Sequence, residues 1–340
     1  MRIDAPPPTF AHLVALSTPL GTFEHARAHV PRSEHGYCVD DVARVALLIA
    51  REPDPSEELV ELGRSSLDFV AAAQDLGGAV RNRRSVYGVW SGPFTLDDCW
   101  GRALWAAGTM WARSTDVESE NLARDIYERS IRRRSPWVRA TAFGALGAVE
   151  VAYRFPDHTA SHDFLVAAAR ILGRTEISPS WRWPESRLSY ANASLCDALL
   201  ATGVALRDDT LTARALAQLD WLVRHETVDG IIVPTPAGGL GPDDHRPRFD
   251  QQPIEVAALA DACQRAFDVT SDPVWRHRVE MCVGWFYGAN SLNVLMYDVE
   301  TSGGYDGLTS AGPNINQGAE STVALLSTLQ YAHAVRPVLA

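Results

Sequence analysis

The feature that most constrains the fold is an alternation of two kinds of helical segment along the chain. Segments of the first kind are apolar on nearly every side and rich in alanine and leucine. A helix of this kind must be surrounded by other elements, because none of its faces suits water. The six predicted inner helices are Tyr37–Ala50, Asp97–Arg113, Pro136–Arg154, Ser189–Leu206, Gln251–Asp268 and Gln317–His333.

Segments of the second kind are amphipathic and read as outer helices with one solvated face. They are Ser56–Gln74, Val117–Arg133, Thr159–Leu172, Asp209–His225 and Asp272–Tyr287, with a short helix near Phe10–Ser17. Six inner and six outer helices in alternation predict an all-α fold, the (α/α)6 toroid or six-hairpin barrel. A closed ring has one core, so we expect residues 1–340 to form a single domain, with 1–8 as an extended N-terminal tail.

The lengths of the connections between helices indicate which end of the ring carries the functional site. Inner helices lead to outer helices through short links, whereas most passages from an outer to an inner helix are long. The long passages are Leu76–Leu96, Gly173–Leu188, Glu226–Asp250 and Gly288–Asn316, and only Arg134–Ser135 is short. Long loops in compact domains are usually functional. We therefore expect the site where the inner helices begin, and where helix starts offer unpaired N–H groups.

Four carboxylates near these starts are candidate catalytic residues. An aspartate at a helix start is a favoured N-cap, which explains many such residues without any function. Asp41 and Asp98 each follow another aspartate, however, and one side chain suffices for a cap. Glu255 and Glu320 lie about one turn inside apolar helices, where a buried carboxylate needs a partner or a raised pKa. A capping-box role is the alternative for the two glutamates.

The same starts and loops supply candidate substrate-binding residues. Asn, Gln, Asp and Arg side chains suit sugar hydroxyls, and a flat indole suits the apolar face of a sugar. We expect the loop residues Trp90, Trp181 and Trp183 to face the cleft, with ordinary loop packing as the alternative. The other candidates are Asp40, Asp97, Trp100, Arg102, Tyr190, Asn192, Gln251, Gln252, Tyr305, Asp306, Asn316 and Gln317.

Composition excludes several classes of function. The net charge of -11 argues against nucleic-acid binding, and the absence of lysine excludes a Schiff-base or phosphate-loop lysine. The five cysteines form no C-x-x-C pair and the histidines no H-E-x-x-H motif, so we expect no metal and no cofactor. No apolar run spans a membrane, and the N-terminus lacks a signal-peptide pattern, which predicts a cytoplasmic protein.

Four segments in order carry a family resemblance: HGYCVDDVARVALL, DDCWGRALWAAG, RFDQQPIEVAAL and GGYDGLTSAGPNINQGAESTVALL. Together they resemble bacterial (α/α)6-toroid, glycoside-hydrolase-like domains, often labelled glycosyltransferase-associated, over roughly residues 18–333. The resemblance implies a role in mannoside or related glycan metabolism. It also implies a glycosyltransferase or phosphorylase of the same pathway as partner. The adjacent aspartates are also similar to those of (α/α)6 endo-mannanases.

The resulting hypothesis is a glycoside hydrolase, in which one protonated carboxyl assists the leaving oxygen and a second, ionised one activates water or attacks the sugar. Resemblance to toroid glycosidases implies inversion. A phosphorylase would use Arg102 or Arg139 to bind phosphate, and an epimerase or lyase would need His35, His245 or Tyr190 as proton carrier. A catalytically silent glycan-binding module is the remaining alternative.

Overall fold

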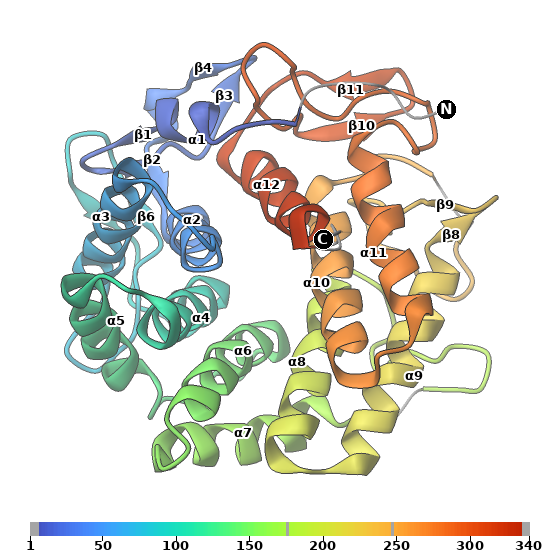
Figure 1. Ribbon diagram of the computed structural model, residues 1–340, viewed down its shortest axis with the longest axis horizontal. Coiled ribbons are helices and arrows are strands. Elements are labelled where there is room, and N and C mark those ends of the chain that lie inside the picture. The colour runs from blue at the N-terminus through green and yellow to red at the C-terminus, as the bar shows by residue number, and fades with distance from the viewer. Residues whose placement is uncertain (1–6, 175–176, 246–247, 335–340) are drawn as a thin grey trace, which may run out of the picture.

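The computed structural model describes residues 7–174, 177–245 and 248–334, and its inner helices form a closed ring (Figure 1). Each inner helix contacts the next, and the last contacts the first. The inner helices are α2 (Val39–Ala50), α4 (Asp98–Arg113), α6 (Val138–Arg154), α8 (Asn192–Leu206), α10 (Pro253–Thr270) and α12 (Ala319–Ala334). The (α/α)6 toroid expected from the sequence is confirmed. The predicted tail falls partly on residues 1–6, outside the described residues.

An outer helix packs beside each inner one, and α1, the first outer helix, packs on α12. The outer helices are α1 (Ala11–Ala15), α3 (Glu57–Ala73), α5 (Val117–Ser130), α7 (Thr159–Leu172), α9 (Asp209–His225) and α11 (Pro273–Phe286). Every predicted helix is present, with each bound within three residues of its expected place. None of the helices in the described ranges is both long enough and apolar enough to cross a membrane.

Inner and outer helices begin differently. Five outer helices have an N-cap whose side chain accepts a backbone N–H: Ser56, Asp116, His158, Asp208 and Asp272. At the starts of α2, α4, α6, α8 and α10, which all lie within the described residues, the N-cap side chain makes no such bond. Capping therefore explains Asp116, Asp208 and Asp272, and it does not account for the acidic residues at these five inner helix starts.

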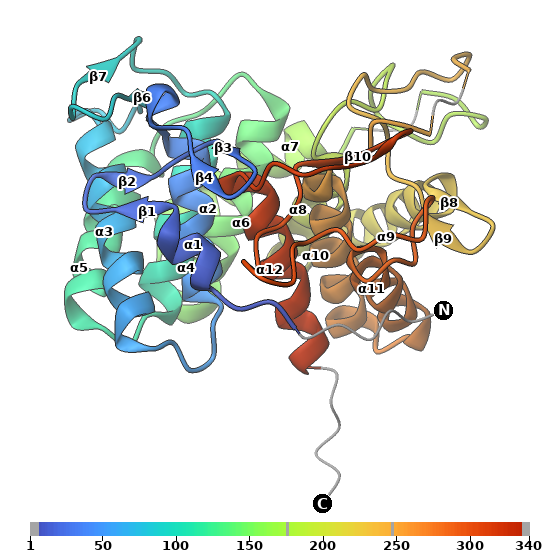
Figure 2. The ribbon, with the colours of Figure 1, turned by 90° about the horizontal axis from the view of Figure 1, so that it is seen from above.

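Short antiparallel hairpins decorate the ring. They pair β1 (Ser17–Thr18) with β2 (Gly21–Thr22), β3 (Ala26–Arg27) with β4 (Val30–Pro31), β8 (Thr227–Val228) with β9 (Ile231–Ile232) and β10 (Gly307–Thr309) with β11 (Gly312–Asn314). A three-stranded sheet joins β5 (Tyr37–Cys38), β6 (Arg83–Arg84) and β7 (Trp90–Ser91). Figure 2 shows β6, β7 and β10 at one end of the ring with the loops that precede α8 and α10.

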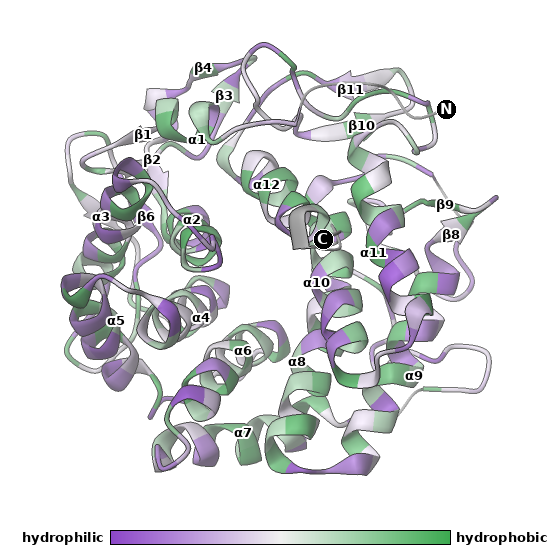
Figure 3. Cartoon of the chain, viewed as in Figure 1, coloured by the Kyte–Doolittle hydropathy of each residue, from purple (hydrophilic) through white to green (hydrophobic). Residues whose placement is uncertain are grey.

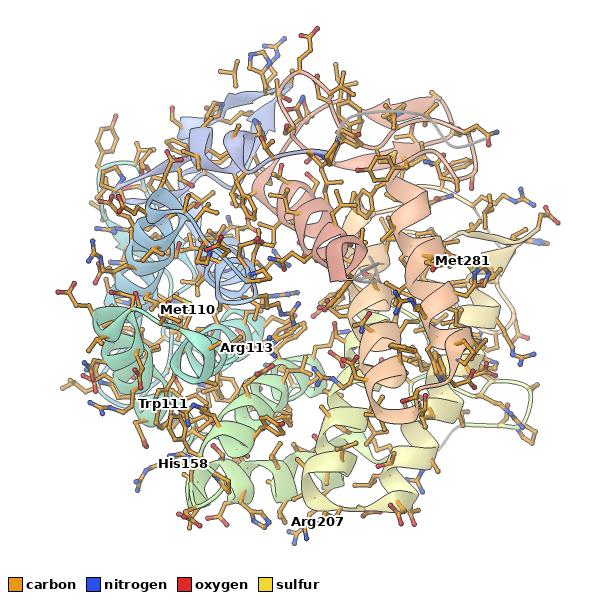
Figure 4. All side chains as sticks on the ribbon, in the orientation of Figure 1. Met110, Trp111, Arg113, His158, Arg207 and Met281 are labelled. Carbon is orange, nitrogen blue, oxygen red and sulfur yellow. The ribbon has the colours of Figure 1, made fainter. Side chains whose placement is uncertain are left out.

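Apolar side chains fill the space between the two layers of helices, and polar residues cover the outer helices (Figure 3). Trp111 of α4 illustrates the packing, because its ring meets that of His158 at 5.3 Å, as their places in Figure 4 show. Glycines let α4 and α6 approach closely. A Cβ on Gly101 would lie 2.4 Å from the backbone oxygen of Ala140. This contact brings the first turns of the two helices together.

Ion pairs cross the ring away from the loop end. Arg51 of α2 reaches Asp261 of α10 at 3.1 Å, and the hydroxyl of Tyr331 on α12 donates to the same carboxylate at 2.6 Å. Arg113, labelled in Figure 4 at the end of α4, pairs with Glu150 of α6 at 2.7 Å. The first two contacts tie the ends of α2 and α12 to α10, and the third ties the neighbouring helices α4 and α6.

We expect Gly101→Ala to destabilise the protein by roughly 1–2 kcal/mol, because overpacking against α6 outweighs the better helix propensity of alanine. Thermal and denaturant unfolding would measure the loss. Gly238→Ala is the control, since a Cβ there meets nothing within 4 Å. Equal stabilities of the two variants would contradict the close contact.

Candidate functional site

A cavity of about 500 Å³ opens where the inner helices begin. It is lined by residues of α2, α4, α10 and α12 and of the segments before α2, α8, α10 and α12. Eight of the predicted site residues line it: Asp40, Asp41, Asp98, Arg102, Tyr190, Gln252, Asp306 and Glu320. With Glu24, the lining contains six carboxylates, against the guanidinium groups of Arg44 and Arg102. The cavity is therefore strongly acidic.

Arg44 bridges two of these carboxylates, Asp41 of the first inner helix, α2, and Glu320 of the last, α12. One terminal nitrogen lies 2.5 Å from Asp41 Oδ1, and the other lies 2.7 Å from Glu320 Oε2. Burial alone would lower the pKa of Arg44, but Glu320 and Asp41 outweigh it and raise that pKa. A permanently charged guanidinium thus holds the starts of α2 and α12 together and fixes the positions of both carboxyl groups.

Asp41 is the buried carboxyl of the cavity, with 3% of its surface exposed. Burial raises its pKa to about 6, Arg44 opposes the rise and Glu320 adds to it. The thiol of Cys38, at 3.2 Å, donates to Asp41 Oδ2 and also opposes the rise. Asp41 can therefore hold a proton in mildly acidic solution, unlike an exposed aspartate.

Asp40 and Arg102 form an ion pair in the wall of the cavity. Arg102 is buried, stacks on Phe143 at 4.0 Å, and has its Nε 3.2 Å from Asp40 Oδ1. Neither of these two atoms has a hydrogen-bond partner with adequate geometry among the described residues. Asn82 holds the other oxygen of Asp40 at 2.9 Å. The ion pair and the Asn82 contact therefore fix the carboxylate of Asp40 at the cavity wall.

Asp98 is positioned by a chain of contacts from α6 and the segment before α8. The hydroxyl of Tyr190 donates to Asp98 Oδ2 at 2.7 Å. Burial and then Asp98 raise the pKa of Tyr190, which keeps this hydroxyl a donor. Arg139 lies 4.7 Å from the Tyr190 ring and donates to its backbone oxygen, while Glu185 binds Arg139 at 3.0 Å. Half-buried Asp98 is thus held in place and faces the cavity.

Glu255 does not line this cavity, although the sequence places it one turn inside α10 as a catalytic candidate. Its oxygens accept the backbone N–H groups of Ala191, at 2.6 Å, and Asn192, at 3.4 Å. It therefore satisfies the start of the neighbouring helix α8, where Ala191 has a left-handed conformation. Burial, followed by the charge of Glu226, raises the pKa of Glu255 to about 8.

The tryptophans predicted to face the cleft lie elsewhere. Trp181 and Trp183 are buried and pack against Trp221 of α9. Trp100 is fully buried in the helical core, and Trp90 packs on Phe69 at 4.8 Å. Trp100, Trp181 and Trp183 share one reason, since a large apolar ring gains more from burial in the core than from a place in a polar loop, whereas Trp90 is only partly buried and stands in β7.

Most of the predicted amides support loops instead of lining the cavity. Gln251 is buried and bonds to Ser291 and Trp285, and Gln317 bonds to Thr301 and Asp298. Three more candidates also lie outside the lining: Asn192 accepts from Ser189, Asn316 accepts from Ala28, and Asp97 is exposed at the start of α4. Tyr305, half-buried beside the core, is outside it too. Among the amides, only Gln252 stays at the cavity in the described part of the chain.

Sequence reasoning missed Arg44, Glu24 and His25. Arg44 had a signal, because it is the charged residue inside the apolar run of α2 and stands three positions after Asp41. Glu24 and His25 precede β3 in a hairpin that carries no strong local pattern. His25 lines the cavity and meets His35 edge-to-face at 5.0 Å, whereas His35 and His245 do not line it.

Glu24, Cys38 and Asp41 have side-chain atoms within 4.8 Å of one another, a spacing that could suit a metal ion. These side chains already have partners. Arg83 pairs with Glu24, Arg44 pairs with Asp41, and the Cys38 thiol donates a hydrogen bond to Asp41. Burial raises the pKa of Cys38 well above its usual range, so a thiolate ligand is disfavoured. The trio is an ion-paired cluster.

Solved structures of carbohydrate-active enzymes share the fold. A sugar epimerase from a ruminal bacterium aligns with a TM-score of 0.71 at 10% identity, over 94% of this chain and 95% of its own. The cellobiose 2-epimerase of Spirochaeta thermophila gives 0.69 at 11% identity, over 97% and 95%. A cellulase of C. cellulolyticum in complex with cellobiose gives 0.60 at 8% identity, over 92% and 87%.

No protein-family model matches the sequence, and no curated protein matches it either. At about a tenth of residues identical, the solved structures establish the toroid and nothing finer. Epimerases and a cellulase on one fold also show that the ring accommodates several reactions on sugars. The chemistry of this chain must therefore be argued from its own cavity.

We expect Glu255→Gln to flatten the pH dependence of stability. Between pH 4.5 and about 8 the unfolded chain has released the Glu255 proton while the folded protein keeps it, so stability falls as pH rises. The substitution should remove a change of roughly 5 kcal/mol over this window. Denaturant unfolding at several pH values would measure it. An unchanged slope would mean that Glu255 is ionised in the folded protein.

Proposed function

We propose that this chain is a glycoside hydrolase that acts on neutral oligosaccharides, with Asp41 as general acid and Asp98 as general base. The observation that carries the proposal is that one cavity holds two carboxyl groups that differ in burial and in hydrogen-bond partners. Asp41 is buried with a pKa of about 6, and Asp98 is half-buried and held by the Tyr190 hydroxyl. Environments that treat two carboxyls differently are what acid/base hydrolysis requires.

In the proposed step, Asp41 gives its proton to the glycosidic oxygen as the bond from that oxygen to the anomeric carbon breaks. Asp98 takes a proton from a water molecule whose oxygen attacks the same carbon from the opposite face, which inverts the anomer. Asp41 ends ionised and Asp98 protonated, and exchange with solvent restores both. Asp40 and Arg102 hold neighbouring hydroxyls of the sugar.

The charge of the cavity favours water over phosphate as the attacking group. Both guanidinium groups lie against carboxylates: Arg44 pairs with Asp41 and Glu320, and Arg102 lies beside Asp40. Asp98, Asp306 and Glu24 add three further carboxylates to the lining, and their negative charge would repel an incoming phosphate. The same repulsion disfavours the anionic substrates of a lyase. A glycosyltransferase or phosphorylase of the same pathway stays a partner expected from the sequence resemblance.

A sugar epimerase is the second candidate. His25 is the one imidazole that lines the cavity among the described residues, and it could move a proton to or from a sugar carbon. Two of the similar solved structures are named as sugar epimerases. Epimerisation in heavy water places deuterium on carbon, whereas hydrolysis does not.

We expect Asp41→Asn and Asp98→Asn each to lower kcat/KM for glycan hydrolysis by roughly a hundredfold or more, since each removes a proton-transfer group. Glu255→Gln, outside the cavity lining, should keep turnover within roughly threefold. Proton NMR in heavy water of gluco- and manno-oligosaccharides would report bond cleavage, the first anomer formed and deuterium on carbon together. Full activity in either aspartate variant, or carbon-bound deuterium without cleavage, rejects the hydrolase assignment.

The pH profile offers a separate check on the acid. Hydrolysis should decline as pH rises through about 6, because Asp41 then loses the proton it must donate. Cys38→Ala removes a hydrogen bond that favours the ionised form, so the pKa of Asp41 should rise and the descending limb should move up by roughly half a pH unit. Cys282→Ala, a buried cysteine of α11, is the control. A limb that stays in place in Cys38→Ala would exclude Asp41 as the titrating group.

A further inference from the structure

Trp137 stands out from the other tryptophans. It is the N-cap of α6, so it lies at the end of the ring where the cavity opens. Its side chain is 58% exposed, and it is the one exposed tryptophan in the described part of the chain. Leaving an indole in water forgoes roughly 2–3 kcal/mol of burial, which calls for an explanation beyond packing.

Contacts link this residue to the wall of the cavity. Two positions further on, Arg139 donates to the backbone oxygen of Tyr190 at 2.6 Å and stacks on its ring. Tyr190 lines the cavity and holds Asp98. The close approach of Gly101 to Ala140 sets the first turn of α6 directly against that of α4. The start of α6 therefore adjoins the side of the cavity that presents the proposed base.

The rim of the cavity is also shortest beside α6. The segments before α4, α8, α10 and α12 each run for 17 residues or more, and hairpins precede α2. Between Ser130, the end of α5, and Val138, the start of α6, only residues 131–137 intervene. Figure 1 accordingly shows the labelled strands beside other parts of the ring. A chain that leaves the cavity meets the least protein here.

We propose that an oligosaccharide extends out of the cavity across the start of α6, where a sugar ring outside the cavity stacks on Trp137. The inference rests on the proposed action on oligosaccharides and defines its substrate class as a glycan longer than the cavity. At about 500 Å³ the cavity has the size of an ordinary small-molecule pocket, so further sugar units must lie outside it. The apolar face of a pyranose fits a flat indole, which is the contact that the exposed Trp137 ring can make.

The test measures binding separately from turnover. Ladders of gluco- and manno-oligosaccharides from two to six units are titrated by calorimetry into the Asp98→Asn protein, alone and with Trp137→Ala. We expect the second substitution to weaken binding roughly fivefold for the longer members and to leave the disaccharides unchanged. Trp137→Phe keeps a flat ring and should restore part of the affinity. Tyr153→Ala is the matched control, because Tyr153 is 89% exposed near the other end of α6.

The outcomes separate this inference from the proposed function. Weakening that is the same at every chain length, or absent at every length, overturns the subsite, and so does a protein that binds no member of either ladder. If the wild-type protein binds the ladder with the expected length dependence but never cleaves it, the subsite stands and the hydrolase assignment fails. Circular dichroism of each variant shows whether the fold is intact.

Discussion

The structure depends on the need of six apolar helices to bury their surfaces against one another. A closed ring satisfies this need, and it leaves the helix starts as the place where polar side chains can meet solvent. The starts converge, so residues as distant in sequence as Asp41 and Glu320 come to share one guanidinium. The acidic cavity is thus a consequence of the ring closure. Arg44 offsets the repulsion between the carboxylates of Asp41 and Glu320, which the closure brings together.

Crowded carboxyls acquire different properties because their surroundings differ. Asp41 binds Arg44 and Cys38 and has a raised pKa. Glu255 instead accepts the backbone N–H of Ala191, just before α8. Both are buried acids on inner helices, and burial raises the pKa of both. Only the first faces the cavity. A raised pKa alone therefore does not mark a catalytic group, and the direction of the side chain decides its use.

The sequence was sufficient for the fold and for part of the site. Hydrophobic periodicity located the helices of the described residues. A helix that is buried on every side is apolar throughout, and a helix that is buried on one side has apolar residues at helical spacing. The candidates Asp40, Asp41, Asp98 and Glu320 all line the cavity, since each stands in the first turn of an inner helix, and their roles stay predictions. Sequence reasoning misplaced Gln251 and Gln317, whose amides hold loops together through partners far along the chain. Such contacts have no local pattern.

The burial of aromatic residues was also difficult to predict from the local sequence. Trp181 and Trp183 occupy a loop and looked available to a ligand, yet both fill the space over α9. Trp137 is the N-cap of α6 and is exposed, and only residues 131–137 connect α5 to α6. Neither the burial of Trp181 and Trp183 nor the exposure of Trp137 follows from the local sequence pattern. The exposed indole beside the shortest connection is therefore what leads us to propose that a glycan leaves the cavity across the start of α6.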